Sequence, residues 1–362
     1  MKILFASRAP FTYNRVCVLT TGLDRVAPDA YELHAIAAKE KASAARLRER
    51  ARAADLVYVP PFRHRDVHFA RANAEGRPVL FDPLIGNYLT RVEDYGWWWR
   101  RPFARYRDRK YFSAADHLVF DTEAHRRWTC DAYGFGGSEG SRERSLTHVL
   151  HIGADTEQWR PGPPKPPGAP LTVGFYGSLV PLQGFGTVLR AVLELQSDPA
   201  LRFVLVGDHG TRPELADLRA RLDPARVTLH DQLPYERLAE EVAGFDIALG
   251  VFGESRKADV VIPNKLYHYA AVGAAIVTRE AEALTEVFTP GEDVVTVPAG
   301  RPEVLAKAVR ELARGGGLRQ NLGARARDLM ERQYAAERVA QRFLDVCARV
   351  VGGAGHARTH LR

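Results

Sequence analysis

Short apolar runs alternate with longer helical stretches along most of the chain. In the first half these runs are KILFA, ELHAIAA, DLVYVP, PVLFDP, HLVFDT and HVLHIG. In the second half they are LTVGFYG, RFVLVG, VTLH, DIALGVF, AAIVT and VVTVP. Short apolar runs of this kind predict buried strands, and strands that alternate with helices predict parallel sheets in α/β layers.

A proline-rich segment divides the pattern. Residues 160–170, RPGPPKPPGAP, contain six prolines, and such segments form semi-rigid spacers without a core of their own. We therefore predict two Rossmann-like domains, at 1–160 and 171–340, joined by a linker at 161–170, with a helix end and an unstructured tail at 341–362. Open α/β sheets bind ligands beyond the carboxyl ends of their strands. We expect the chemistry in those loops, on the two sides of a central cleft.

Composition narrows the class of protein. The chain has 362 residues, of which 46% are hydrophobic and 26% charged, as expected for a globular protein of about two domains. No apolar run approaches the roughly 20 residues of a membrane helix. The start MKILFASRAP predicts a first strand rather than a secretion signal. Cys17, Cys130 and Cys347 are far apart, which indicates neither a zinc site nor a disulfide framework and favours a cytoplasmic location.

The positive charge is concentrated in the first half. Residues 1–160 hold 26 Lys+Arg and 20 Asp+Glu, and they contribute six of the seven net positive charges. An anionic partner for this half, such as a phosphorylated lipid, a membrane face or nucleic acid, is one interpretation, and a solvated surface is the other.

Two strand-to-helix turns of the second half are glycine-rich. The first turns at Gly177 and Ser178 and reaches a helix through Gln183 and Gly184. Glycines let backbone N–H groups approach a phosphate, and the helix N-terminus adds a partial positive charge; an ordinary tight turn has the same pattern. The second turn carries Gly207 and Asp208, and the backbone near Leu233, further along, can face a nucleotide base.

The stretch VVIPNKLYHYAAVGAAIVT gives the strongest phosphate signal. Pro263 suits the first position of a helix that ends near Gly273. The start of the helix at Ile262, Pro263 and Asn264, with Lys257 before the helix and Lys265 in it, predicts a diphosphate site, in which backbone N–H groups of residues other than the proline face the phosphate. Lys257 is the cation that we expect to stabilise the departing diphosphate. The alternative for both lysines is a role in solubility.

Polar residues also follow the strands of the first half. Arg8 follows the first strand and is a candidate for the donor phosphates. His64 and Asp82 are candidates for the reacting centre, although an aspartate at a strand end often caps the next helix instead. The acceptor-side candidates are Asn87, Tyr88 and Asp121.

Residues 95–112, YGWWWRRPFARYRDRKYF, combine three tryptophans with a run of arginines. Aromatic and cationic side chains together are typical of a membrane interface that meets lipid phosphate, and also of nucleic-acid binding. The alternative is a helix whose aromatic residues pack on the core. We expect a lipid-phosphate or polyanionic acceptor near this segment.

These residues resemble the retaining glycosyltransferases of family 4, the glycosyl transferases group 1, which have the GT-B fold. The resemblance covers about residues 140–345 and rests on LHIGADTEQWRP, VGFYGSLVPLQGFGTVLRAV, FVLVGDHG and the run from PNKLYHYAAVG to VLAKAVREL. In the first half, RPVLFDPLIGNY and DHLVFDTEAHRR are similar to acceptor-side segments of one subgroup.

The resemblance implies transfer of a hexosyl or related group from a UDP-, GDP- or dTDP-sugar, with retention of configuration, no cofactor and no required metal. The acceptor is expected to be lipid-linked, a glycan or a small molecule, and contact with the inner face of an anionic membrane is expected. The chain departs from the family at three charged donor contacts. Val260 and His268 replace two glutamates, and Gln183 replaces a lysine. We expect a neutral His268 to accept a hydrogen bond from a sugar or ribose hydroxyl.

Two other functions use the same fold. One is a nucleotide-sugar epimerase or a pseudo-glycosyltransferase, and the other is a catalytically silent nucleotide-sugar-binding subunit, which the missing glutamates favour. No recognised motif supports nucleic-acid binding.

Overall fold

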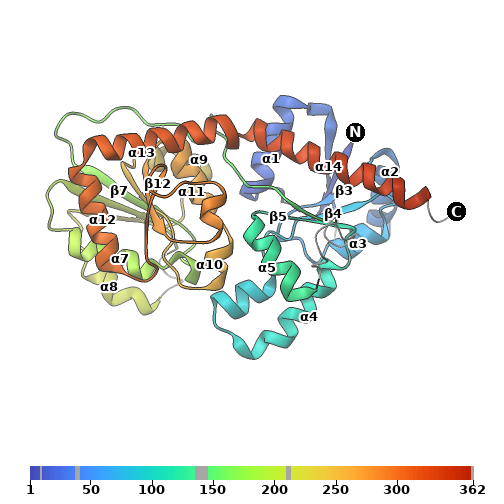
Figure 1. Ribbon diagram of the computed structural model, residues 1–362, viewed down its shortest axis with the longest axis horizontal. Coiled ribbons are helices and arrows are strands. Elements are labelled where there is room, and N and C mark those ends of the chain that lie inside the picture. Colours follow the sequence, from blue (N-terminus) through green and yellow to red (C-terminus); the bar gives the residue numbers. More distant parts are fainter. Residues whose placement is uncertain (9, 37–40, 135–145, 209–212, 360–362) are drawn as a thin grey trace. The chain divides into compact units, whose positions relative to one another are not determined.

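The computed structural model describes residues 1–8, 10–36, 41–134, 146–208 and 213–359. The chain forms two compact units (Figure 1). Unit 1 comprises Met1–Gly153 and Tyr334–Arg362, and unit 2 comprises Ala154–Gln333. Within the described ranges, each unit contains one six-stranded sheet in which all pairs of neighbouring strands are parallel.

The sheet of unit 1 has the strand order β2-β1-β3-β4-β5-β6. All six apolar runs predicted for this half are strands: β1 (Ile3–Ser7), β2 (Tyr31–Ala35), β3 (Leu56–Val59), β4 (Val79–Phe81), β5 (His117–Phe120) and β6 (Thr147–Val149). The helices are α1 (Asn14–Val26), α2 (Lys41–Ala53), α3 (Val67–Ala72), α4 (Arg101–Phe112), α5 (Glu123–Tyr133) and α14 (Ala336–Thr359). Between β4 and α4 lie a π-helix, η2 (Tyr88–Asp94), and a 3-10 turn, η3 (Trp98–Arg100).

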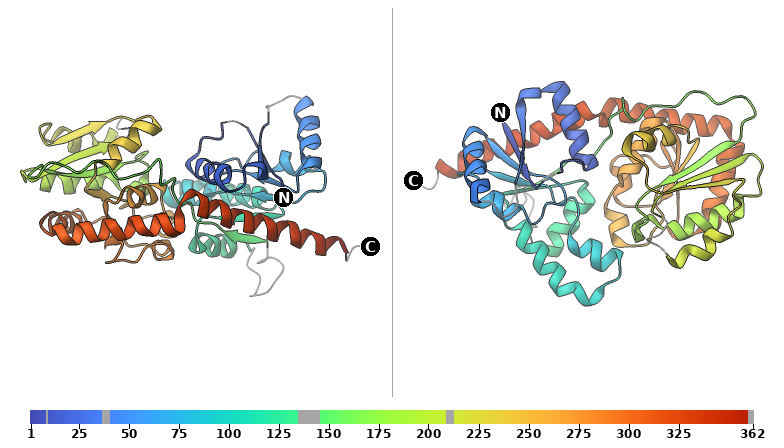
Figure 2. Two further views of the ribbon diagram at one scale, coloured as in Figure 1. Left: turned by 90° about the horizontal axis from the view of Figure 1, so that it is seen from above. Right: turned by 180° about the vertical axis from the view of Figure 1, so that it is seen from behind.

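Alternate strand residues of unit 1 face two different apolar cores. One core joins the sheet to α1 and α14 through residues such as Phe5, Leu19 and Phe343. The other joins it to α2, α3 and α4 through residues such as Leu47 and Phe112. Helix α14 (red) lies alongside the sheet of unit 1 in both views of Figure 2. The α1–α14 contact requires glycine, because a Cβ at Gly22 would lie 2.0 Å from the carbonyl oxygen of Ala336.

The sheet of unit 2 has the order β12-β11-β10-β7-β8-β9. Its strands are β7 (Leu171–Tyr176), β8 (Leu201–Val206), β9 (Val227–His230), β10 (Ile247–Leu249), β11 (Ala275–Arg279) and β12 (Val294–Val297), again at the six predicted runs. The helices are α7 (Phe185–Leu195), α8 (Ala216–Ala220), α9 (Tyr235–Ala243), α10 (Arg256–Val260), α11 (Asn264–Val272), α12 (Pro302–Arg314) and α13 (Gly316–Leu329). A single apolar core joins α7 and α12 to the sheet.

The units divide at positions other than the predicted boundaries. The first division lies between Gly153 and Ala154, before the proline-rich segment. That segment is held by unit 2, because the Lys165 ammonium contacts the Asp246 carboxylate at 2.5 Å and donates to Thr172 Oγ1 at 2.7 Å. The chain then returns to unit 1 at Tyr334, where α14 extends through Thr359, so the tail predicted to be unstructured is helical for most of its length.

No helix in the described ranges is long and apolar enough to cross a membrane.

Candidate functional site

Two glycine turns lie side by side at the carboxyl edge of the unit 2 sheet. Gly177 follows β7 and Gly207 follows β8, and the Gly177 N–H donates to the Val206 carbonyl at 3.0 Å. A Cβ at Gly207 would lie 2.5 Å from the Gly177 carbonyl oxygen. The close approach of the two turns therefore depends on the glycine at 207.

Lys265 places a buried cation beneath the first of these turns. Its side chain belongs to α11 and the residue is only 3% exposed. The ammonium lies 3.6 Å from the centre of the Phe175 ring and donates to the Gly250 carbonyl at 3.3 Å. Among the described residues, no carboxylate forms an ion pair with it, and burial holds its pKa well below the usual lysine value. A buried cation of this kind is a ready partner for an anion.

Gly177 lies close to both Lys265 and Gln183. A Cβ at Gly177 would lie 3.0 Å from Lys265 Nζ and 3.1 Å from the Gln183 amide carbon. The Gln183 side chain is buried, and its Oε1 has no hydrogen-bond partner among the residues that the structure describes. Gly184 has φ 61° and caps α7, and a Cβ there would collide with the Phe252 backbone. The structure thus brings together four of the predicted donor-site residues.

His268 lies in an aromatic stack. Its ring is 3.7 Å from the Trp159 ring, with 11° between the planes. Its Nδ1 is 2.5 Å from the Tyr176 hydroxyl, and burial lowers the pKa of His268 to about 3. The imidazole is therefore neutral at physiological pH, and the aromatic stack covers one of its faces.

The remaining donor candidates lie around this group. Pro263 was predicted at the first helical position, but it lies one residue earlier, as the N-cap of α11 with φ −62° and ψ 142°. Ile262 is buried and Asn264 is half-buried. Lys257 is half-buried on α10. Ser178 is exposed after Gly177, and Asp208 and Leu233 are half-buried in the loops after β8 and β9.

The structure places Asp82 in a buried ion pair. Asp82 is 0% exposed and forms an ion pair with the buried Arg15. It also accepts from the Tyr58 hydroxyl at 3.0 Å and from the Leu84 N–H at 3.0 Å. The sequence could not reveal the pair, because Arg15 is distant in the chain and lies on α1. With every described contact internal to unit 1, the carboxylate supports the packing of α1 on the sheet.

Asp121 also has an internal partner. Its Oδ1 lies 2.7 Å from Nδ1 of the buried His125. The next residue, Thr122, caps α5 by accepting from the His125 N–H at 3.0 Å. The Asp121 carboxylate therefore has a partner within unit 1, beside the first turn of α5.

Asn87 and Tyr88 are held by a carboxylate that the sequence did not single out. Asp108, fully buried on α4, accepts from the Asn87 N–H and side-chain amide and from the Tyr88 N–H, each at 2.8 Å. It also accepts from the Tyr133 hydroxyl at 2.9 Å. As the single acid in RPFARYRDRKYF it was visible in the sequence, but its burial was not. Asp108 orders the start of η2.

His64 lies in the wall of two neighbouring cavities of unit 1. A cavity of about 400 Å³ is bounded by Ile85, Tyr95 and Trp97, and another of about 190 Å³ is bounded by arginines; both share Phe62, His64 and Asn87. Burial is the main cause that lowers the pKa of His64 to about 4. Its Nε2 is buried and has no hydrogen-bond partner in the described part of the chain.

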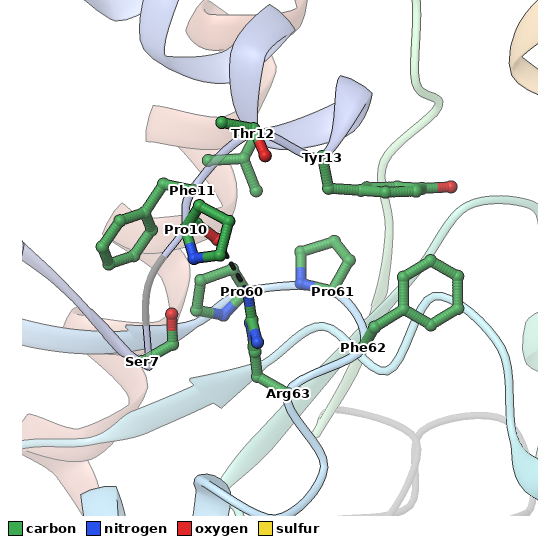
Figure 3. Close-up of a pocket in the computed structure, with 10 residues that line it drawn as sticks. Ser7, Pro10, Phe11, Thr12, Tyr13, Pro60, Pro61, Phe62 and Arg63 are labelled. Carbon is green, nitrogen blue, oxygen red and sulfur yellow. Dashed lines mark hydrogen bonds between the residues drawn. The ribbon is translucent and has the colours of Figure 1, made fainter. Parts of the chain in front are cut away.

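Phe62 connects these cavities to a third one. The third, of about 310 Å³, lies between the loop at Pro10–Tyr13 and the Pro60–Arg63 loop (Figure 3). Phe62 is exposed and has φ 61°, a left-handed conformation that is rare outside glycine. Such strain is concentrated at functional sites, and Phe62 was not predicted.

Comparisons with known proteins agree with this geometry. A family model described as "Glycosyl transferase-like" matches residues 187–345. The lipopolysaccharide core biosynthesis glycosyltransferase LpsE of Rhizobium meliloti is 24% identical over 183 residues, and the match spans about half of each chain (51%). Anabaena Alr3699/HepE in complex with UDP is 13% identical with a TM-score of 0.71, over 96% of this chain and 100% of that one. Sucrose-phosphate synthase from Thermosynechococcus elongatus is 12% identical with a TM-score of 0.71, over 98% and 100%.

Residues 187–345 are thus similar to the glycosyl transferase-like family, and the chain has the GT-B fold. The predicted resemblance and fold class are thereby confirmed.

The three departures have different surroundings. Val260 is fully buried, Gln183 lies close to Gly177, and His268 is stacked on Trp159. Trp159 and Tyr176 were not predicted, although Trp159 lies in the quoted motif LHIGADTEQWRP. In the described part of the chain, no three His, Cys, Asp or Glu side chains are grouped to hold a metal ion.

Proposed function

We propose that this chain is a glycosyltransferase that moves a sugar from a nucleotide sugar to an acceptor, with retention of configuration and without a metal. The observation that carries the proposal is Lys265, a buried cation without a carboxylate partner among the described residues, at the carboxyl edge of the unit 2 sheet. Solved structures with the same fold were obtained with UDP and with UDP-glucose, which favours a UDP-sugar over a GDP- or dTDP-sugar.

In the proposed donor site, the diphosphate lies over Gly177 and the N-terminus of α11. Lys265 and Lys257 supply positive charge where the departing diphosphate develops negative charge. The amide of Gln183 takes the place of a cation, and neutral His268 with Tyr176 forms the polar wall that the two glutamates form in typical members. Because a front-face retaining transfer needs no strong protein base, stabilisation of the leaving group is the main task.

On the acceptor side, His64 and Asn87 line the cavities of unit 1. His64, with a pKa near 4, is a weak base at neutral pH. We propose that it accepts a hydrogen bond from the acceptor hydroxyl and orients it, rather than removing its proton fully. That the transferred group is a hexosyl group is part of the proposal, and the neighbour solved with UDP-glucose supports it.

The first experiment is a thermal-shift panel with UDP, GDP, dTDP, ADP and CMP. A ligand that binds only the folded state raises the unfolding temperature by mass action, and we expect the largest shift with UDP. The protein is then incubated with the matching nucleotide sugar alone. Slow release of free sugar supports a transferase, an isomeric nucleotide sugar indicates an epimerase, and an unchanged donor indicates a silent binding subunit.

We further propose that unit 1 contacts an anionic membrane on the cytoplasmic side. Side chains of η3 and α4 expose large aromatic groups, with Trp98 at 75% and Tyr106 at 66%, beside Trp99 and Phe103. Exposed arginines accompany them, while Asp108, the acid of this segment, is buried. Aromatic and arginine side chains together suit the headgroup region of a bilayer.

Replacing Trp98 and Tyr106 with serine should weaken partitioning to phosphatidylcholine–phosphatidylglycerol vesicles by about tenfold or more, because each ring buries apolar area at the interface. Sedimentation with the vesicles measures the effect. Leu229→Ser/Leu318→Ser, which removes two exposed apolar side chains from unit 2, is the matched control. Equal sedimentation of both variants and the wild type would contradict the membrane contact.

A further inference from the structure

The smaller cavity of unit 1 is lined almost entirely by cationic and hydrogen-bond-donating side chains. Its volume is about 190 Å³, and Arg8, Arg63, Arg65 and Arg107 contribute to its wall. Its other lining residues are Phe62, His64 and Asn87, so no carboxylate lines it among the residues that the structure describes. Four guanidinium groups around one small space repel one another unless an anion lies between them.

The surroundings neutralise only part of this charge. Arg8 is paired with Asp66, at 2.6 Å from Nε to Oδ1. Arg63 donates to the Pro10 carbonyl at 2.7 Å, which leaves its charge uncompensated (Figure 3). Arg107 lies over the Phe103 and Tyr111 rings, which position the guanidinium without cancelling its charge. Asp108 is close enough to raise the pKa of His64 against the effect of burial, but its oxygens are engaged by Asn87, Tyr88 and Tyr133.

The neighbouring cavity is larger, about 400 Å³, and more apolar. Ile85, Tyr95 and Trp97 give it apolar walls, and Arg91 is its one arginine among the described lining residues. The two cavities share Phe62, His64 and Asn87. One ligand that spans both would have an anionic group next to a ring or apolar body, with His64 alongside the junction.

We propose that the arginine-lined cavity is a subsite for an anionic group of the acceptor, a phosphate or a carboxylate, held by Arg63, Arg65 and Arg107. The inference rests on the proposed transferase function, because it names the chemical class of that reaction's acceptor. The planar guanidinium fork matches the oxygens of both anions in two-point contacts. The rest of the acceptor lies along Tyr95 and Trp97, and His64 faces the hydroxyl to be glycosylated.

The test measures binding of phenyl phosphate to the full-length protein by calorimetry, with phenyl β-glucoside as the uncharged comparison. The double variant Arg65→Gln/Arg107→Gln should weaken phenyl phosphate binding by about tenfold or more, because each of its two substitutions removes a charge-assisted hydrogen bond. Arg202→Gln/Arg221→Gln, which removes two exposed arginines from unit 2, should change it by less than about twofold. Equal unfolding temperatures of the variants establish that both are folded.

A second arm identifies the source of the anion and separates this inference from the transferase function. Tighter binding of monomeric dihexanoyl phosphatidic acid than of phenyl phosphate supports a lipid-borne acceptor, and the reverse order supports a water-soluble one. Lys265→Met should leave phenyl phosphate binding unchanged while weakening UDP binding. If UDP does not bind to the wild type but the double variant Arg65→Gln/Arg107→Gln loses phenyl phosphate binding, the result supports the anion subsite and contradicts the transferase function. If neither anion binds, or both bind the double variant as well as the wild type, the subsite is overturned.

Discussion

Replacing Lys265 with methionine is expected to stabilise the protein and to weaken nucleotide binding at the same time. The buried ammonium donates to one carbonyl and lies over two aromatic rings, and burial lowers its pKa. Methionine has a similar length and no charge to bury, so the free energy of unfolding at neutral pH should rise by about 1 to 2 kcal/mol. Loss of the charge-assisted contact should weaken UDP binding by about tenfold or more.

The stabilisation should depend on pH in a defined direction. The folded-state pKa of Lys265 lies below its unfolded value, so between those two values the unfolded chain binds more protons and wild-type stability rises with pH. The gain in the free energy of unfolding from Lys265→Met should therefore be largest below the folded-state pKa of Lys265. It should diminish as the pH rises from that value to the unfolded-state pKa. Urea unfolding at several pH values measures it, with the exposed Lys307→Met as control. A variant that is less stable than the wild type at neutral pH would contradict the argument.

Replacing Asp82 with alanine is expected to destabilise unit 1 by about 3 to 5 kcal/mol, because it leaves the charge of Arg15 buried without its partner. Burial alone would lower the pKa of Arg15, but Asp82, Tyr58 and Asp121 together outweigh it and the pKa is raised, so the guanidinium keeps its proton. The urea-unfolding midpoint and the near-ultraviolet circular dichroism of the variant report the loss.

The double variant Arg15→Met/Asp82→Leu separates a structural role from a catalytic one. It removes both charges, and replacement of a buried ion pair by apolar residues is often nearly neutral for stability. We expect this variant to fold and to retain donor turnover. Normal stability of Asp82→Ala together with lost turnover would instead return Asp82 to the reacting centre.

The strands were predictable because each is a short apolar run between helical stretches, and the glycine turns because they follow those runs directly. Burial on both faces of a parallel sheet produces this pattern locally in the sequence. The unit boundaries were not predictable in the same way. The prolines at 161–170 mark an irregular segment, but only tertiary contacts such as Lys165–Asp246 attach it to unit 2.

In the candidate site, too, local features could be predicted from the sequence and tertiary contacts could not. Gly177, Gln183 and Lys265 are brought together as their loop positions suggested. The partners of Asp82 and Asp121 could not be predicted, because a strand-end aspartate looks the same in the sequence whether it faces a ligand, a distant Arg15 or a nearby His125. The arginines beside His64 and the strained Phe62 became visible only when the folded chain placed them around common cavities.

The central claim is that Lys265 binds the diphosphate of a nucleotide-sugar donor. Calorimetric titration of UDP in buffers of different protonation enthalpy tests it most directly, because an incoming diphosphate raises the lowered pKa of Lys265, and at a pH between its free and bound pKa values binding takes up a proton. For the wild type, we predict that UDP binding takes up a proton and weakens as the pH rises. For Lys265→Met, we predict weaker UDP binding than for the wild type and no proton uptake. UDP binding of equal affinity to both proteins, without proton uptake, would contradict the claim.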